Sequence, residues 1–431
     1  MTRHRPLGLV AAAVLATALV TGCAGQPAEP DPTAAPGPAQ SGAQSTGRPS
    51  GSPSPSVASP SPSADPSPTN PGRPSPTPTE TAAPPNEAPA PGEPDLSLVA
   101  GWSLEEKVGQ LVMVGLPVKG PFQPTFDMVR DDHIGGVFLH GRTQAGRQPV
   151  KNLVDAAVDA AAQEREPLFV ATDQEGGQVQ VLRGQGFSDI PSAVDQARLD
   201  PAELRARATT WGQELAAAGV NLNLSPVMDL VPAGSAAANA PIGAFGRSYG
   251  FTPDSVTAHA NAFAAGQRAA GVQTSIKHFP GLGRVTANTD TTAGVTDTET
   301  GPDAPSVGVF RSGIEAGTGL VMMSSAVYTR IDPDAPAVFS PTAVGLVREL
   351  GFDGVIISDD LSAAVQVTGI PAGQRAVRAV DAGVDLVLAS AKPAVAGDMV
   401  AALVAAARDD DAFAAKVDAA AARVVAAKAG L

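Results

Sequence analysis

Short, almost continuous apolar runs recur along the chain after about residue 100. Eight of them stand out, at residues 111–116, 136–139, 168–172, 220–224, 272–276, 320–324, 354–358 and 384–388. They are rich in β-branched residues and show no alternation of polar and apolar positions, which is typical of strands buried on both faces of a parallel sheet. The pattern therefore predicts eight buried strands.

Helical patterns separate most of these runs. They lie at residues 155–164, 202–219, 256–271, 342–350 and 374–383, and a long Ala/Val-rich helix is expected at 398–428. Ser103 and Glu106 form a capping box that opens a further helix before the first run. Eight strand–helix units fit one α/β fold, a (β/α)8 barrel of the TIM type. A doubly wound open sheet is the alternative, but no Gly-x-Gly-x-x-Gly turn follows the first run.

The N-terminal region has a different composition. A basic stretch at 3–5 precedes an apolar stretch at 7–20, and residues 20–23 read Val-Thr-Gly-Cys, which matches a bacterial lipobox. We therefore predict a lipoprotein signal peptide at 1–22, with Cys23, the only cysteine, as the lipid attachment point. An ordinary secretory signal with an incidental cysteine is the alternative. Residues 23–94 are dominated by Pro, Ser and Thr and are expected to form a disordered tether. The barrel then occupies residues 95–431.

These features place the protein outside the cytoplasm, lipid-anchored to the outer face of the cell membrane in the cell-wall space. The formal net charge of −14 argues against a nucleic-acid partner, because no cluster of Lys and Arg is present to neutralise phosphates. The five histidines are scattered without His-x-x-x-His spacing, so no metal site and no cofactor are expected.

Polar side chains gather just after several of the predicted strands. The set comprises Asp173, Asn223, Asp229, Arg247, Lys277, His278, Asn288, Asp290, Asp359 and Asp360. In a TIM barrel the loops that follow the strands build the active site on one face. Two carboxylates beside cationic donors suit a polyhydroxylated ligand, and a carboxylate pair is what cleavage of a glycosidic bond requires.

Each residue also has a plainer interpretation. Asp173 could cap a helix, and one of Asp359 and Asp360 could cap the helix that follows them. Arg247, in a loop flanked by glycine, could be a structural tie. His278 could be a satisfied core histidine. The collection of all these groups at one rim is what favours a functional site.

Five motifs resemble the family 3 glycoside hydrolases, specifically the single-domain bacterial β-N-acetylglucosaminidases. They are Asp-Gln-Glu-Gly-Gly at 173–177, Asn-Leu-Asn-Leu-Ser-Pro-Val-Met-Asp at 221–229, Gly-Arg-Ser-Tyr at 246–249, Lys-His-Phe-Pro-Gly at 277–281 and Ser-Asp-Asp-Leu-Ser at 358–362. The resemblance implies a retaining exo-β-N-acetylglucosaminidase that acts on cell-wall fragments derived from peptidoglycan. It also implies that Asp359 is the nucleophile.

The same resemblance assigns the sugar-binding residues. It implies that Asp173, Arg247, Lys277 and His278 bind the sugar at the non-reducing end. Two other functions stay open: a catalytically weak sugar-binding lipoprotein of the cell wall, and a β-glucosidase of the same family.

One motif departs from the family pattern. The loop after Lys-His usually carries Asp-Ser-His, with the histidine as acid/base and the aspartate orienting it, whereas this chain has Asn288-Thr289-Asp290 and no histidine beyond His278. Our hypothesis is that Asp290 is the general acid/base, with a pKa raised by burial near Asp359, and that Asn288 orients it. In an alternative register Asp290 is the orienting residue and Thr292 takes the histidine position.

Overall fold

The computed structural model describes residues 92–429 and 431. Within them, eight parallel strands close into a barrel in the order β1-β13-β12-β9-β7-β6-β3-β2. The strands are β1 (Val112–Pro117), β2 (Gly136–His140), β3 (Phe169–Thr172), β6 (Leu222–Asn223), β7 (Gln273–Phe279), β9 (Leu320–Met323), β12 (Val355–Asp360) and β13 (Leu386–Ala389). Each predicted run contributes one strand, so the predicted barrel is confirmed and the open sheet is wrong.

Two strands extend at least two residues beyond their apolar runs. The run at 272–276 ends before Lys277, but β7 continues through Lys277 and His278 to Phe279. Likewise β12 continues through Asp359 and Asp360. These polar residues belong to the barrel wall and not to loose loops, and they lie where the pairing of β7 with β9 and of β12 with β13 shifts register.

Smaller strands stiffen the loops at the carboxyl ends of the barrel strands. A hairpin of β4 (Gln174–Gly176) and β5 (Val179–Gln180) follows β3. A three-stranded sheet joins β8 (Thr296–Asp297), β10 (Val327–Tyr328) and β11 (Asp332–Pro336). The sequence did not predict these elements, because four of them have only two or three residues, too few to show a period, and β11 reads Asp-Pro-Asp-Ala-Pro, which is not a strand-like pattern.

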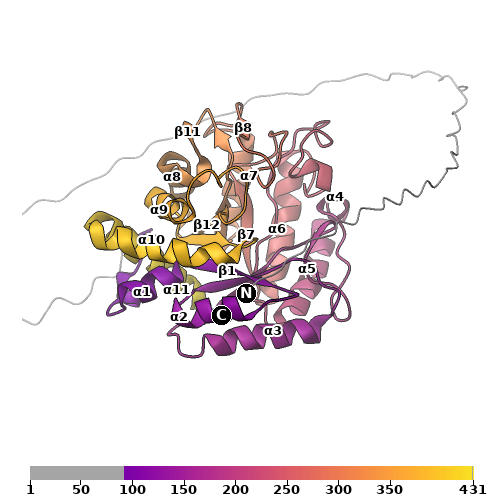
Figure 1. Ribbon diagram of the computed structural model, residues 1–431. Helices are drawn as coiled ribbons and strands as arrows, with labels where there is room; N and C mark the ends of the chain where they lie inside the picture. Colours follow the sequence, from indigo (N-terminus) through magenta and orange to yellow (C-terminus); the bar gives the residue numbers. More distant parts are fainter. Residues whose placement is uncertain (1–91, 430) are drawn as a thin grey trace, which may run out of the picture. The chain divides into compact units, whose positions relative to one another are not determined.

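Helices surround the barrel (Figure 1). They are α1 (Leu104–Gln110), α2 (Gln123–Asp131), α3 (Arg147–Ala160), α4 (Ala193–Gln196), α5 (Pro201–Ala216), α6 (Pro253–Ala269), α7 (Pro305–Glu315), α8 (Pro341–Glu349), α9 (Ala372–Ala382), α10 (Ala396–Asp409) and α11 (Asp411–Lys428), with single 3-10 turns η1 (Leu96–Val99), η2 (Gly243–Phe245), η3 (Ala337–Phe339) and η4 (Pro393–Val395). The predicted capping box is confirmed, since Ser103 Oγ accepts from the Glu106 N–H and Glu106 Oε2 from the Ser103 N–H.

Two helix predictions need correction. The helix expected at 155–164 runs instead over Arg147–Ala160. The single helix expected at 398–428 is two helices, α10 and α11, separated at Asp410. Asp410 is extended, and its side chain accepts from the Ala412 N–H at 2.8 Å, which caps α11. A run of three aspartates favours such a cap over a helix interior, because the short carboxylate binds free N–H groups at a helix start.

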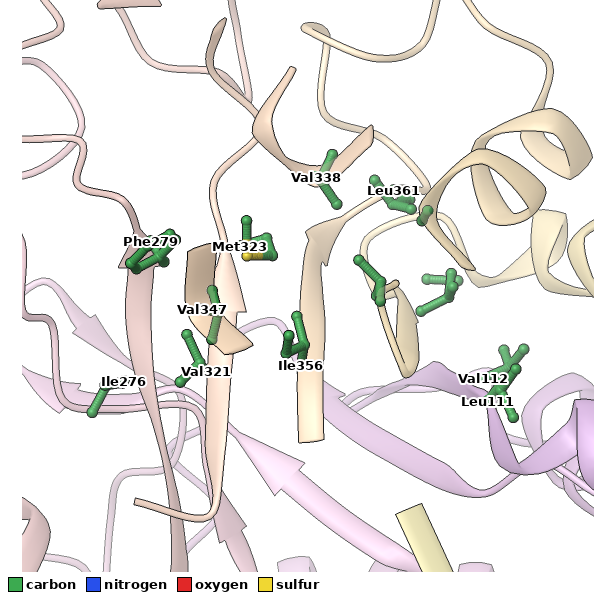
Figure 2. Close-up of a cluster of buried hydrophobic side chains, with 14 of the residues drawn as sticks. Leu111, Val112, Ile276, Phe279, Val321, Met323, Val338, Val347, Ile356 and Leu361 are labelled. Atoms are coloured by element: carbon green, nitrogen blue, oxygen red, sulfur yellow. The ribbon is translucent and has the colours of Figure 1, made fainter. Parts of the chain in front are cut away.

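Alternation along the strands divides their side chains between two cores. Outward-facing residues of β7, β9 and β12, including Ile276, Val321 and Ile356, pack toward surrounding helices such as α8 with Val347 (Figure 2). A second cluster fills the barrel interior with Met113, Phe138, Phe169, Ala171, Leu222, Leu224, Leu320, Met322, Val355, Ile357, Leu386, Leu388 and Val424. The interior is therefore packed, and a ligand can enter only at an end.

Helix α11 closes the amino-terminal end of the barrel. Its Val424 joins the interior cluster. Its Lys428 is 1% exposed, lies 5.3 Å from the centroid of the Phe169 ring, and donates to Gln110 Oε1 at 2.5 Å. Burial lowers the pKa of Lys428 to about 7, despite the opposing influence of Glu166 and Glu164.

Replacing Lys428 with methionine should change how stability depends on pH. In the unfolded chain the amine keeps a pKa of about 10.4, so between about pH 7 and pH 10 the unfolded state binds the additional proton. The free energy of unfolding of the wild type should therefore rise with pH over that window, and this group contributes at most about 1.4 kcal/mol per pH unit. Above about pH 10 the rise should be complete. Urea unfolding at several pH values should show the rise diminished in Lys428→Met. An unchanged slope, or the same change in the exposed Lys416→Met, would contradict this account.

The predictions for the N-terminal region fall almost wholly outside the described residues. These are the signal peptide, the lipidated Cys23 and the tether up to residue 91. Among the residues that the structure describes, no helix has the length and apolar character needed to cross a membrane.

Candidate active site

A cavity of about 200 Å³ lies at the carboxyl ends of the barrel strands. It is lined by Phe138, Asp173, Leu224, Pro241, Arg247, Lys277, His278, Leu282, Asn288, Thr289, Asp290, Met322, Asp359, Asp360, Leu388, Ser390 and Ala391. Eight of the ten polar residues expected at the rim are in this set, Asn288 from the loop after β7 among them; the other two, Asn223 and Asp229, do not line the cavity. Sequence positions far apart thus share one pocket.

A larger pocket of about 550 Å³ lies at the other end of the barrel, beside α11. Small residues of α11 and the Gly317–Gly319 turn form much of its wall, and its charged members are Glu93, Asp95, Arg268, Asp353 and Arg423. It contains none of the residues that the strand ends present. Size alone therefore does not identify the functional site, since in TIM barrels the chemistry belongs to the carboxyl ends of the strands.

A cluster of four charged side chains forms one wall of the smaller pocket. Lys277 Nζ lies 2.6 Å from Asp173 Oδ1 and 2.7 Å from Glu175 Oε1. Arg247 binds Glu175 in a bidentate manner, with Nε to Oε2 and Nη2 to Oε1 both at 2.8 Å, and donates from Nη1 to the Pro241 carbonyl. Lys277 and Glu175 are almost fully buried. Two cations and two anions balance one another, as buried charges require.

The electrostatics of the cluster follow from this pairing. Burial by itself would raise the pKa of Glu175, but Arg247 and Lys277 together lower it to about 2. Burial would likewise lower the pKa of Lys277, but Asp173 and Glu175 overcome it and raise the pKa. Glu175 and Lys277 are therefore charged around neutral pH, and the cluster presents fixed donors and acceptors to a ligand.

Asp173 and Arg247 differ in how they compare with their plainer interpretations. Asp173 does not cap a helix: it lies between β3 and β4 and accepts from Lys277. Arg247 is indeed a structural tie, because its guanidinium holds Glu175 and the Pro241 carbonyl, and it also lines the pocket.

His278 is held by a buried carboxylate. Its Nδ1 lies 2.8 Å from Asp229 Oδ2, while Asp229 Oδ1 accepts from the N–H groups of His278 and Leu282. Asp229 is fully buried and follows β6. A carboxylate at Nδ1 fixes the ring orientation and places the proton on that nitrogen, which directs Nε2 elsewhere. His278 is therefore both a satisfied histidine and a residue of the pocket wall.

The adjacent aspartates at the end of β12 have different surroundings. Asp360 accepts from the N–H groups of Ser362, Ala363 and Ser390 and from the Ser362 hydroxyl. Asp359 accepts from the Asp360 N–H at 2.8 Å. It lies where the pairing of β12 with β13 shifts register, and its side chain lines the pocket at the barrel mouth. Asp360 therefore holds the turn that follows β12 and does not cap a helix as predicted, since the next helix, α9, begins at Ala372; Asp359 is left to react.

Asp290 is carried over the pocket by the loop at residues 284–295. It keeps contact with solvent, yet the surrounding protein removes part of its water, and the Asp359 carboxylate adds repulsion; together they raise the pKa of Asp290 to about 6. Asn288 Oδ1 accepts from the backbone N–H of Asp290 at 2.9 Å. Asn288 thus holds the Asp290 backbone and not its carboxyl. Thr292 is exposed and is not among the lining residues, which disfavours the shifted register.

The family model described as "Glycosyl hydrolase family 3 N terminal domain" matches residues 103–427. The chain belongs to this family. Its β-hexosaminidase relative from Stenotrophomonas maltophilia strain K279a is 36% identical over 279 residues, covering 61% of this chain and 78% of the relative. The motif-based family prediction is therefore confirmed.

Solved structures of family 3 enzymes agree with the fold. A β-N-acetylhexosaminidase from Beutenbergia cavernae DSM 12333 is 57% identical with a TM-score of 0.75, covering 76% of this chain and 99% of that one. A family 3 β-N-acetylglucosaminidase from Paenibacillus sp. str. FPU-7 is 29% identical with a TM-score of 0.69, covering 77% of this chain and 63% of that one. These similarities establish this chain as a glycoside hydrolase built on the TIM-type barrel.

The role of Glu175 in this family 3 barrel was not apparent from the sequence. Glu175 stands two positions after Asp173 in the same motif and is only 3% exposed. A buried glutamate needs cationic partners, and Lys277 and Arg247 provide them. In residues 92–429, no three His, Asp or Glu side chains are placed to hold a metal ion.

Replacing Glu175 with glutamine should destabilise the fold strongly. The change leaves two buried cations with one carboxylate, and breaking a buried ion pair costs about 3–5 kcal/mol of unfolding free energy. Urea unfolding measures the loss. Glu203→Gln, which breaks the exposed pair with Arg207 on α5, is the matched control and should have little effect. Equal effects of the two substitutions would contradict the central position given to Glu175.

Proposed function

We propose that this family 3 enzyme is a retaining exo-β-N-acetylglucosaminidase that removes terminal β-linked N-acetylglucosamine from cell-wall fragments derived from peptidoglycan. One observation carries the proposal: Asp359 and Asp290 face the same small pocket, and Asp290 has a pKa of about 6 beside the Asp359 carboxylate. A nucleophile and a protonated acid in one cavity are what retaining hydrolysis requires.

In the first step Asp359 attacks the anomeric carbon and Asp290 gives its proton to the departing glycosidic oxygen. A covalent glycosyl-enzyme forms and the aglycone leaves. In the second step Asp290, now ionised, takes a proton from water, which attacks the anomeric carbon and releases Asp359. Each step balances, and each ends with the two carboxyl groups ready for the next.

The charged wall supplies the binding. Asp173 and Lys277 lie side by side at its edge and offer an acceptor and a donor to vicinal hydroxyls, while Arg247 adds a further donor and His278 Nε2 a further acceptor. The pocket, at about 200 Å³, is smaller than typical sites for drug-sized ligands and suits one sugar ring. A cavity for a single sugar supports exo action on chain ends. The N-acetyl preference rests on the names of the relatives in Stenotrophomonas maltophilia and Beutenbergia cavernae.

The test is direct. The purified protein is incubated with aryl N-acetyl-β-glucosaminide, with aryl β-glucoside and with peptidoglycan fragments, and the anomer first released is read by NMR. We expect release of β-N-acetylglucosamine from the first and third substrates. Faster cleavage of the glucoside would favour the β-glucosidase alternative, and saturable binding without turnover would favour the sugar-binding lipoprotein. Release of the α-anomer would refute the retaining mechanism.

We also propose that Cys23 carries a lipid and that the following Pro/Ser/Thr-rich segment extends the barrel into the cell-wall space. The lipobox motif and the composition of the tether support this location. In fractionated cells, the wild type should stay with the membrane and Cys23→Ala should leave it. Equal membrane retention of both proteins would contradict lipidation at Cys23.

A further inference from the structure

The loop that carries Asp290 is joined to the segment that follows the nucleophile. The Val365 N–H donates to the Asp290 carbonyl at 3.2 Å, and the Gln366 N–H donates to the Thr289 carbonyl at 3.0 Å. With Asn288 bound to the Asp290 N–H, both backbone polar groups of Asp290 are occupied. The backbone of Asp290 is therefore fixed from two sides.

The side chain of Gln366 adds a second attachment further along the loop. Its Oε1 accepts from the Val295 N–H at 2.9 Å, and its Nε2 donates to the Val295 carbonyl at 3.2 Å. The amide thus pairs with one peptide group as a neighbouring strand would. The Val295 carbonyl also accepts from Val327 N–H beside the β8–β10 pair. Gln366 connects the Asp290 loop to this sheet.

From these contacts we propose that Gln366 is a positioning residue that sets the location of the Asp290 carboxyl over Asp359. Gln366 follows Asp359 by seven positions on the segment after β12, so the bonds it makes tie the two reacting carboxyl groups together through one short stretch of chain. This inference rests on the proposed function.

Proton transfer tolerates little displacement of the general acid. A general acid acts only within hydrogen-bond reach of the atom it protonates, and a displacement of about 1 Å can cost about 100-fold in rate. Asp290 has a short side chain on a surface loop, so its carboxyl follows its backbone closely. Losing the Gln366 amide releases the loop at Val295 while leaving the pocket wall of Asp173, Glu175 and Lys277 intact.

The test compares Gln366→Met with Gln148→Met, which makes the same change on the exposed face of α3, where Gln148 bonds Asn152. Two aryl N-acetylglucosaminides are used, one with a poor leaving group that needs protonation and one with a dinitrophenyl group that does not. For Gln366→Met we expect kcat/KM to fall about tenfold or more on the first substrate and to stay within about twofold on the second. The KM for the second substrate and the inhibition constant of N-acetylglucosamine should hardly change.

Every outcome bears on the proposal. Equal losses on the two substrates would show that Gln366 only supports the fold, and no loss on either would show that it positions nothing; both overturn the inference. If Gln366→Met does not fold, Gln366→Asn, whose amide is one methylene too short to reach Val295, takes its place with the same expectation. If the wild type is inactive on both substrates, the proposed function is refuted and the inference with it. If the wild type is active and Gln366→Met does not change its activity, only the inference is refuted.

Discussion

Replacing Asp359 with asparagine should reduce kcat on every substrate by a factor on the order of 10⁴ or more, because no covalent intermediate can form without the nucleophilic carboxylate. The substitution keeps the size of the side chain and the hydrogen bond that it accepts from the Asp360 N–H. The fold should therefore survive. Steady-state assays measure the loss, and urea unfolding shows whether stability is retained.

Two controls make this result specific. Asp353→Asn makes the same change at the opposite end of the barrel and should leave activity intact. Trapping the wild type with a fluorinated N-acetylglucosamine analogue should label a peptide that contains Asp359. A label on another carboxylate, or normal turnover of Asp359→Asn, would overturn the assignment.

Replacing Asp290 with asparagine should affect substrates according to their leaving groups. For a poor leaving group, loss of general acid catalysis should lower kcat/KM by about 10²–10⁴-fold. For a dinitrophenyl leaving group kcat/KM should hardly change, but kcat should fall, because water then attacks the intermediate without a general base. Added azide, which needs no deprotonation, should restore kcat and yield a glycosyl azide. Equal losses on both substrates, or none, would contradict the acid/base role.

The pH profile provides an independent check on Asp290. The acid must be protonated to act, and burial and the repulsion by Asp359 raise its pKa to about 6. The active fraction should therefore decline as the pH rises through that value. The profile of kcat/KM should show an alkaline limb near pH 6, belonging to the coupled pair and not to one carboxyl. In Asp290→Asn that limb should disappear; if it persists, another group is the acid.

Much of the fold could be predicted because strand burial leaves a direct mark on composition. Each apolar run corresponds to a barrel strand, and the capping box at Ser103 begins a helix where expected. The break at Asp410 was missed because alanine and valine continue on both sides, although the three aspartates at 409–411 are a local signal for a helix cap. The hairpin after β3 and the sheet around β8 were likewise missed, because such short strands are decided by what they pair with.

Only part of the candidate site could be predicted from the sequence. The motifs identified the residue types, and the resemblance supplied their expected roles. The partnership of Glu175 with Arg247 and Lys277 could not be read, because it joins positions 72 and 102 residues apart. Asp359 and Asp360 are adjacent residues of the same type, so the sequence does not distinguish their roles. Only their hydrogen bonds show which one caps the turn.

The sequence by itself determined the eight strands, the family and the collection of polar residues at the strand ends, because these depend on periodicity and on local motifs. Only the tertiary structure decided which charges are paired, that Asp290 lies beside Asp359 with a raised pKa, and that Gln366 binds the loop between them. The physical reason is that pKa values and hydrogen bonds depend on distance and on the removal of water, and both are set when the barrel closes and brings the loops together.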